Sequence, residues 1–231
     1  VGPKKIHLNS LIGKKITLNF SGNIFCENCQ TKTEQSHHQG FCLNCSSKLA
    51  ECDSCKIKPE LCHYREGTCR EPSWGEENCL TDHIVYLSYT SGYKVGITRE
   101  KNIPSRWIDQ GAGMAVPLFR VSERLISGLV EEAFKEFVAD KTNWRQMLMN
   151  DSTPTKDDMK SKAAELISLA KEKVDGIALS LGADAISLLD EEPVKINYPI
   201  PTQRPFEKVG MPHNLDKKPT LSGIFHGVKG Q

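Results

Sequence analysis

The sequence lacks any hydrophobic segment of the kind that enters or crosses a membrane. No run of about eighteen apolar residues occurs, which is the length that a spanning helix requires. Residues 1–10, VGPKKIHLNS, contain no apolar core of a signal peptide. We therefore expect a cytoplasmic protein without a membrane partner. Because the chain begins without Met and ends in strand-like sequence, IFHGVKGQ, we also expect truncation at both ends.

An excess of charge of either sign is also missing. The 30 Lys and Arg residues balance 29 Asp and Glu residues, for a net charge of +1. Composition alone therefore predicts no strong non-specific attraction to phosphate, and any basic surface must be assembled by folding. Phosphate-binding and dinucleotide glycine loops, the HExxH motif and the serine nucleophile elbow are absent as well, which excludes the enzyme classes that depend on them.

Cysteine is absent after residue 79. All nine cysteines lie between Cys26 and Cys79, several of them in Cys-x-x-Cys pairs. An exported scaffold usually spreads an even number of cysteines along the chain in disulfides, so this clustered, odd-numbered set indicates a reducing compartment and metal binding. The apolar content of residues 26–83 is too low for an independent core, so we expect metal to hold this segment together.

Two of the Cys-x-x-Cys pairs have the spacing of a zinc ribbon. Twelve residues separate them, and each pair forms a tight turn that presents two thiolates on one side. Together the turns complete a tetrahedral shell made by Cys26, Cys29, Cys42 and Cys45. Four sulfur ligands leave no open position, so this zinc is expected to be structural rather than catalytic. The alternative is a set of scattered buried thiols.

A second group of metal-ligating side chains follows. Cys52 and Cys55 form a third pair, and the later candidates are Cys62, His63, Cys69, Cys79 and His83. Their spacing matches no single site, so we expect a second zinc held by Cys52, Cys55 and two of the later cysteines. A binuclear cluster and an unligated remainder stay open. A redox role is disfavoured, because redox Cys-x-x-Cys motifs open a helix in a βαβ unit.

The patterning divides the chain into four segments of an α+β protein. Residues 1–25 are expected to form strands, residues 26–83 a zinc-ribbon-type module, and residues 84–150 a compact α/β domain. Residues 151–231 are expected to form a helix and a small β unit, for which pairing with the N-terminal strands is one arrangement.

Apolar periodicity predicts the elements of the α/β domain. IVYLSY and YKVGIT are two strands joined by a turn at Ser91–Gly92, and AVPLFRV is a third strand. Pro104 begins a short helix, and SGLVEEAFKEFV is a longer helix with one apolar face. That face is formed by Val130, Phe134, Phe137 and Val138. A long helix, KDDMKSKAAELISLAKEKVDGIALSL, follows a polar linker.

These motifs carry two resemblances. The order of a strand tyrosine, the string YKVG, a helical arginine and a helical glutamate resembles the GIY-YIG nuclease superfamily over about residues 84–145. The longer strings VYLSYTSGYKVGITR, RWIDQGA, CREPSWGEENC and DKTNWRQML resemble a bacterial family, domain of unknown function 2797, over most of the chain. The resemblances imply a GIY-YIG-like domain joined to an N-terminal zinc module.

The superfamily resemblance implies hydrolysis of a phosphodiester bond with one divalent metal. By position, Tyr86 would activate water, Arg106 would steady the phosphate and Glu131 would bind Mg²⁺ or Mn²⁺, with Asn143 a counterpart of the late polar residue. A tyrosine with a pKa near ~10 needs a neighbouring cation or metal to act as a base at neutral pH, and a guanidinium suits planar phosphate contacts. From the residues alone, Glu132 is as well placed as Glu131.

The chain departs from the superfamily pattern at both motifs. IVY replaces the glycine-bearing first motif, and Lys94 stands where the second motif has tyrosine. Tyr93 lies one position earlier, so on a strand it should face away from Lys94. Lys94 would bind phosphate or lower the pKa of Tyr86, and it is equally consistent with a binding domain that has lost catalysis.

Three functions remain open on these observations. The leading hypothesis is a zinc-stabilised protein that binds DNA or RNA and hydrolyses it with a divalent metal. The alternative is a non-catalytic adaptor that binds a protein or an RNA–protein assembly. A small-molecule site around Trp107 and Gln110 is the third. The non-functional interpretation is that Tyr86 and Tyr93 are half-buried strand aromatics, that Arg106 forms a surface ion pair and that Glu131 lies at the solvated border of an amphipathic helix.

Overall fold

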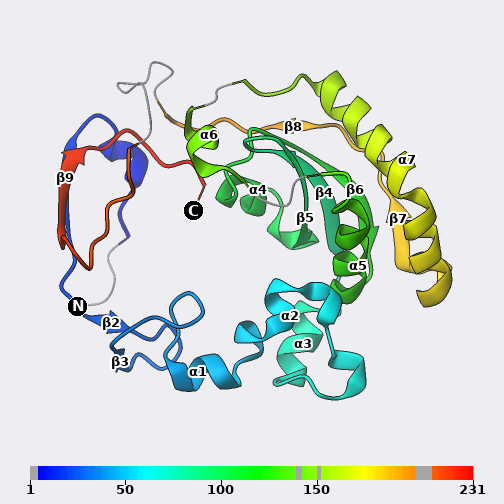
Figure 1. Cartoon of the computed structure of the whole chain (residues 1–231), viewed down its shortest axis with the longest axis horizontal. Coiled ribbons are helices and arrows are strands. Elements are labelled where there is room, and N and C mark those ends of the chain that lie inside the picture. The colour runs from blue at the N-terminus through cyan, green and yellow to red at the C-terminus, as the bar shows by residue number, and fades with distance from the viewer. Residues whose placement is uncertain (1–4, 139–141, 150–151, 201–209, 231) are drawn as a thin grey trace.

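The computed structural model describes residues 5–138, 142–149, 152–200 and 210–230, and it has an α+β fold (Figure 1). The main sheet contains five antiparallel strands in the order β5-β4-β6-β7, and β8 also pairs with β6. These strands are β4 (His83–Tyr89), β5 (Tyr93–Arg99), β6 (Met114–Val121), β7 (Ile186–Leu188) and β8 (Val194–Lys195). The predicted hairpin and third strand are confirmed, and β5 forms the edge of the described sheet.

The helices of this unit cover both faces of the sheet. They are α4 (Ser105–Asp109), α5 (Arg124–Phe134), α6 (Trp144–Met149) and α7 (Lys156–Leu181). α5 and α7 share one hydrophobic core with the sheet, and Figure 1 shows them on the same side of it. On the opposite face, Tyr86 and Trp107 pack edge to face with ring centroids 6.0 Å apart. Because β4 is buried on both faces, its sequence is continuously apolar rather than alternating.

The two longer helices follow their predicted apolar patterns. α7 has the predicted bounds, and its first turn is closed by a capping box between Thr155 and Asp158. α5 ends at Phe134, before the predicted end of the pattern, although Phe137 and Val138 still pack against the same core. The residues that α7 buries in that core are Met159, Ala163, Leu166, Ala170 and Val174.

α7 and the two strands that follow it pack together with the main sheet. Instead of opening a separate unit, α7 completes the core under the main sheet, while β7 and β8 extend the sheet beside β6. Strand pairing of this kind depends on residues far apart in the chain, so a polar linker in the sequence does not reveal it. α7, β7 and β8 therefore share the core and the sheet of β4, β5 and β6.

The cysteine-rich segment is built from short elements rather than long ones. Its strands and helices are β2 (Ile24–Phe25), β3 (Lys32–Thr33), α1 (Leu43–Lys48), α2 (Ser54–Ile57) and α3 (Pro72–Asn78). The 3₁₀ helices of the described chain are η1 (Leu8–Leu11), η2 (Ala50–Cys52), η3 (Pro59–Leu61), η4 (Tyr64–Glu66), η5 (Glu100–Asn102) and η6 (Ala183–Ala185). Elements this short bury little apolar surface of their own, which agrees with the expectation that metal stabilises the segment.

This segment docks directly onto α5. η3 packs so closely that a Cβ atom on Gly128 would lie 2.4 Å from the backbone nitrogen of Glu60. Beside this contact, the Arg124 guanidinium donates to the Lys56 carbonyl (2.6 Å) and the Arg124 backbone N–H donates to the Cys79 carbonyl (2.8 Å). The cysteine-rich segment and the α/β domain therefore meet in a close, hydrogen-bonded interface.

The two ends of the chain form a ribbon of their own. β1 (Lys15–Asn19) pairs antiparallel with β9 (Thr220–Ile224), and the Thr17 and Ser222 hydroxyls hydrogen-bond across it at 2.8 Å (Figure 1). This confirms the expected pairing of the C-terminal tail with the N-terminal strands. None of the helices in the described part of the chain has the length and apolarity needed to cross a bilayer.

Candidate functional site

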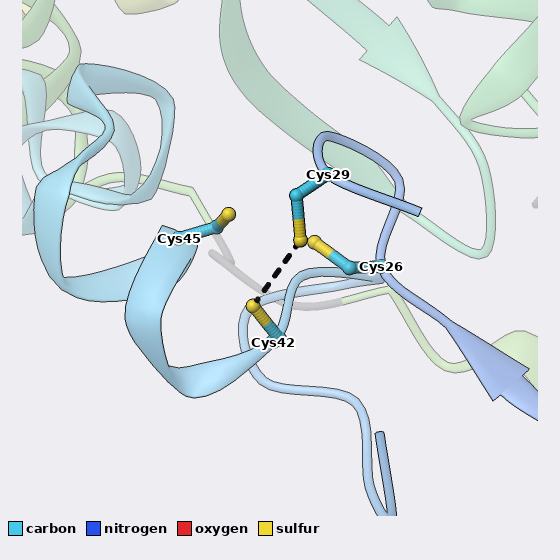
Figure 2. Close-up of side chains that lie close together, drawn as sticks. All are labelled: Cys26, Cys29, Cys42 and Cys45. Atoms are coloured by element: carbon cyan, nitrogen blue, oxygen red, sulfur yellow. Dashed lines mark hydrogen bonds between the residues drawn. The ribbon is translucent and has the colours of Figure 1, made fainter. Parts of the chain in front are cut away.

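The predicted zinc-ribbon cysteines come together in space. The sulfurs of Cys26, Cys29, Cys42 and Cys45 all lie within 4.8 Å of one another, with 3.8 Å between Cys29 and Cys42. Figure 2 shows the four side chains converging, two from the turn after β2 and two from the start of α1. A zinc ion with sulfur ligands at ~2.3 Å has sulfurs about 3.8 Å apart at the corners of its tetrahedron. The cluster can therefore hold a zinc ion.

Local hydrogen bonds prepare these thiols unequally for ionisation. Burial acts to raise the pKa of Cys26, but N–H groups of Cys29, Cys42 and Asn28 lower it to about 6. At Cys45, the Asn28 amide donates to the sulfur (3.4 Å) and acts to lower the pKa, whereas burial and the neighbouring thiols raise it to about 11. Four adjacent thiolates repel one another, so a bound divalent cation is what allows all four to ionise together.

The other predicted ligands lie in different surroundings. Asp53, Cys55 and His63 bring one ligand atom each within 4.8 Å of one another, whereas Cys52 belongs to neither group of close ligand atoms. His83 is fully buried in β4, where its Nδ1 donates to the Thr81 carbonyl (2.6 Å). Burial lowers the pKa of His83 to about 4, so its ring is neutral at physiological pH. Cys62, Cys69 and Cys79 surround a small cavity together with Cys55.

A basic pocket lies along the edge strand of the main sheet. Its volume is about 270 Å³, and the six consecutive residues 94–99 of β5 line it together with residues from α2, α4 and α5. Because neighbouring residues of one strand point to opposite faces, a cavity that touches all six must wrap around the strand's edge. Its cationic side chains are Lys56, Lys94, Arg99, Arg106 and Arg124. Among the described residues that line it, Glu131 supplies the one carboxylate.

The tyrosine predicted to be catalytic lies just behind this pocket. Tyr86 is paired with Gly96 across β4 and β5, and a Cβ atom on Gly96 would lie 2.9 Å from the phenol oxygen. The hydroxyl donates to Oε1 of Gln110 (2.7 Å), and Arg106 lies close enough to act on it directly. Burial raises the pKa of Tyr86 far above its ordinary value, although Arg106 acts in the opposite direction. The phenol is therefore a protonated hydrogen-bond donor at neutral pH.

Three of the five predicted catalytic residues line the pocket itself. These are Lys94, Arg106 and Glu131, and both Arg106 and Glu131 act electrostatically on the Tyr86 phenol. Tyr93 does face away from Lys94, as strand geometry predicts, because its ring packs against Tyr89 on the core side at 5.2 Å. The order of motifs along the chain thus does bring a phenol, a guanidinium and a carboxylate to one place.

The remaining candidates have other roles in the structure. Asn143 is not among the lining residues, and its side-chain oxygen instead accepts the backbone N–H groups of Arg145 and Gln146 at the start of α6. Glu132 pairs with Lys135 on the outer side of α5, so Glu131 is the glutamate at the pocket. Trp107 is buried in the core, and of the Trp107–Gln110 pair only Gln110 reaches the pocket.

Sequence reasoning missed three of the five cations. Lys56 belongs to the acidic cysteine-rich segment, and Arg124 lies 68 residues further along the chain, yet the two are hydrogen-bonded neighbours. Arg99 ends β5 and donates to Asn78 of α3. Nothing in the local pattern marks these residues, because docking of the cysteine-rich segment is what places them beside the sheet edge.

Comparison with known proteins supports the resemblance to domain of unknown function 2797, which extends over most of the chain. No curated protein and no solved structure matches the chain. The GIY-YIG-like fold and function therefore stay predictions. A model of the family described as "Protein of unknown function (DUF2797)" matches residues 13–231. The chain belongs to this family.

Proposed function

We propose that this protein binds a nucleic-acid strand through the basic pocket and hydrolyses a phosphodiester bond there with a divalent metal. The observation that carries the proposal is the composition of the pocket: five cationic side chains and one carboxylate along the edge of β5. The net charge of the chain is only +1, so this concentration of positive charge is local. A phosphate group is the common biological ligand that suits such a site.

The individual side chains support distinct roles. Arg106 offers planar, paired N–H donors to phosphate oxygens, and Lys94 adds a compact positive charge from β5. Glu131 is the residue that would hold Mg²⁺ or Mn²⁺, as a carboxylate suits both ions. Such an ion supplies charge stabilisation and an activated water when it is bound. Tyr86, being protonated, positions neighbouring groups through its hydrogen bond to Gln110 rather than accepting a proton.

The size of the pocket limits how a nucleic acid enters it. A volume of about 270 Å³ is at the small end of ligand pockets and cannot admit a duplex. We therefore expect the scissile phosphate to enter on a single-stranded or locally unpaired segment, with the remaining strand lying outside.

A cleavage assay with a matched pair of glutamate variants tests the proposal. Wild-type protein supplied with Mg²⁺ or Mn²⁺ should cut fluorescently labelled single-stranded DNA or RNA. Glu131→Gln should lower the cleavage rate about a hundredfold or more, because the metal loses its carboxylate ligand. Glu132→Gln removes the same charge from the next residue, which pairs with Lys135 outside the pocket, and should cut at the wild-type rate.

A second function has one observation in its favour. Tyr86 is fully buried and already hydrogen-bonded, an arrangement that also suits a site that binds without catalysing. A non-catalytic adaptor for a protein or an RNA–protein assembly would leave the labelled strand intact with either metal. Equal, metal-independent cleavage by wild type and Glu131→Gln would instead indicate a contaminating nuclease and overturn the assignment of Glu131.

A further inference from the structure

Four thiols outside the zinc-ribbon cluster surround one small cavity. Its volume is about 10 Å³, and its walls include Cys55, Cys62, Cys69 and Cys79. The thiols of Cys62 and Cys79 are in hydrogen-bond contact, and Cys55 interacts electrostatically with Cys62 and Cys69. All four are free thiols. The space is about the size of one water molecule, and Asp53 and His63 line it together with the four reduced thiols. These are the side-chain types of a metal site rather than of an organic ligand site.

We propose that Cys55, Cys62, Cys69 and Cys79 hold a second structural zinc. Each thiol comes from a different short element: α2, the residue after η3, the loop before α3 and the residue after α3. One ion would therefore tie together four elements that bury little apolar surface. This assignment differs from the one expected from the sequence, because Cys52 does not line the cavity. Cys52 is instead buried and interacts electrostatically with Arg70 and Cys26.

The neighbouring group of Asp53, Cys55 and His63 is a rival ligand set. Two of its members already have partners. The Asp53 carboxylate binds Arg70 Nε at 2.7 Å and lies 3.5 Å from His63 Nε2, and His63 Nδ1 hydrogen-bonds the Thr68 hydroxyl at 2.7 Å. Asp53 and His63 line the same cavity, but these contacts already engage both side chains with Arg70 and Thr68. Four thiolates also match the ligand preference of structural zinc better than a carboxylate, an imidazole and a single thiolate.

The surroundings suit the charge of a tetrathiolate site. Zinc with four thiolates carries two negative charges, and the half-buried Arg124 guanidinium acts electrostatically on Cys79, Cys55 and Cys62. The backbone N–H of Arg124 also donates to the Cys79 carbonyl, and Lys56 follows Cys55 directly in the chain. The second zinc would therefore hold Arg124 and Lys56 in place at the basic pocket. The proposal of a second zinc does not depend on what that pocket binds.

Zinc content measured on the purified full chain tests the ligand set. Mass spectrometry of the metal should find two zinc ions per chain in the wild type, two in Cys52→Ser and two in His63→Gln, but one in Cys69→Ser. Two ions in Cys69→Ser together with one in His63→Gln would overturn the tetrathiolate assignment in favour of the rival set. One ion in the wild type would overturn the second site altogether.

Cobalt substitution of the wild type gives a second test that does not depend on a variant folding. Two equivalents of Co²⁺ should each add the strong sulfur charge-transfer and red-shifted d–d absorption of a tetrahedral tetrathiolate site. A second equivalent with weaker, blue-shifted d–d bands, typical of mixed nitrogen, oxygen and sulfur ligands, would contradict the proposal.

Discussion

At the scale of single residues, the contact between Gly96 and Tyr86 is what allows the phenol to lie against the pocket wall. The two residues are cross-strand partners, and any side chain at position 96 would occupy the place of the phenol oxygen. The ring cannot retreat easily, because Trp107 packs against it in a buried core. A glycine in this strand allows the Tyr86 ring to approach the backbone closely, and it does not indicate a weak strand.

Replacement of Gly96 by alanine should therefore be costly. The added Cβ would lie 2.9 Å from the Tyr86 oxygen, so Gly96→Ala is expected to lower the free energy of unfolding by about 1–3 kcal/mol. Gly92→Ala in the same hairpin is the matched control, since a Cβ there would meet nothing within 4 Å. Urea denaturation of both variants checks the prediction, and equal midpoints would show that Tyr86 is not held against position 96.

Residue order along the chain predicted part of this site. Tyr86, Lys94, Arg106 and Glu131 could be proposed together because their motifs occur in a fixed order, and strand alternation correctly separated Lys94 from Tyr93. Asn143 was grouped with them on order alone, but it caps α6. Lys56, Arg99 and Arg124 had no local signal, because packing between distant segments brings them in.

At the scale of elements, α5 contacts the main sheet, the basic pocket and the cysteine-rich segment. Arg124 and Glu131 of this helix line the pocket, while Gly128 meets η3 of the cysteine-rich segment. The contact at Gly128 involves backbone atoms of Pro59 and Glu60, which cannot rotate away as a side chain could. The distance between α5 and the cysteine-rich segment is therefore set by the absence of a side chain at this position.

Gly128→Ala should separate these elements. A Cβ at 2.4 Å from the Glu60 nitrogen must push η3 outward, which we expect to cost about 3 kcal/mol and to weaken ligand binding in the pocket. Gly176→Ala in α7 meets nothing within 4 Å and should stabilise the helix by up to about 1 kcal/mol. Thermal unfolding of the pair is the measurement, and a neutral Gly128→Ala would contradict the close docking.

The elements themselves were largely accessible from the sequence, but their grouping was not. The β4–β5 hairpin, α4, β6 and α7 follow from local periodicity, turn residues and a capping box. Pairing of β7 and β8 with β6 joins residues that are 65 to 81 positions apart, and no local pattern specifies it. The polar stretch before α7 suggested a boundary in the sequence, but the segments on its two sides share one core.

At the scale of the whole molecule, folding converts a nearly neutral chain into one with a concentrated basic site. The cysteine-rich segment has little core, its four zinc-ribbon cysteines can hold a zinc ion, and Lys56, Ile57 and Pro59 of this segment line the basic pocket. Composition reports the sum of charges and not their positions, so only the structure reveals the pocket. The proposed function requires that a nucleic-acid phosphate bind in this pocket.

Fluorescence anisotropy with a labelled single-stranded oligonucleotide tests that claim most directly. Arg106→Ala should weaken binding by about tenfold to a hundredfold, and wild-type affinity should fall steeply as salt is raised. Lys171→Ala removes one positive charge from an exposed ion pair with Asp175 on α7 and should bind as wild type does. Equal loss of affinity in the two variants, or no binding by the wild type at low salt, would contradict the account.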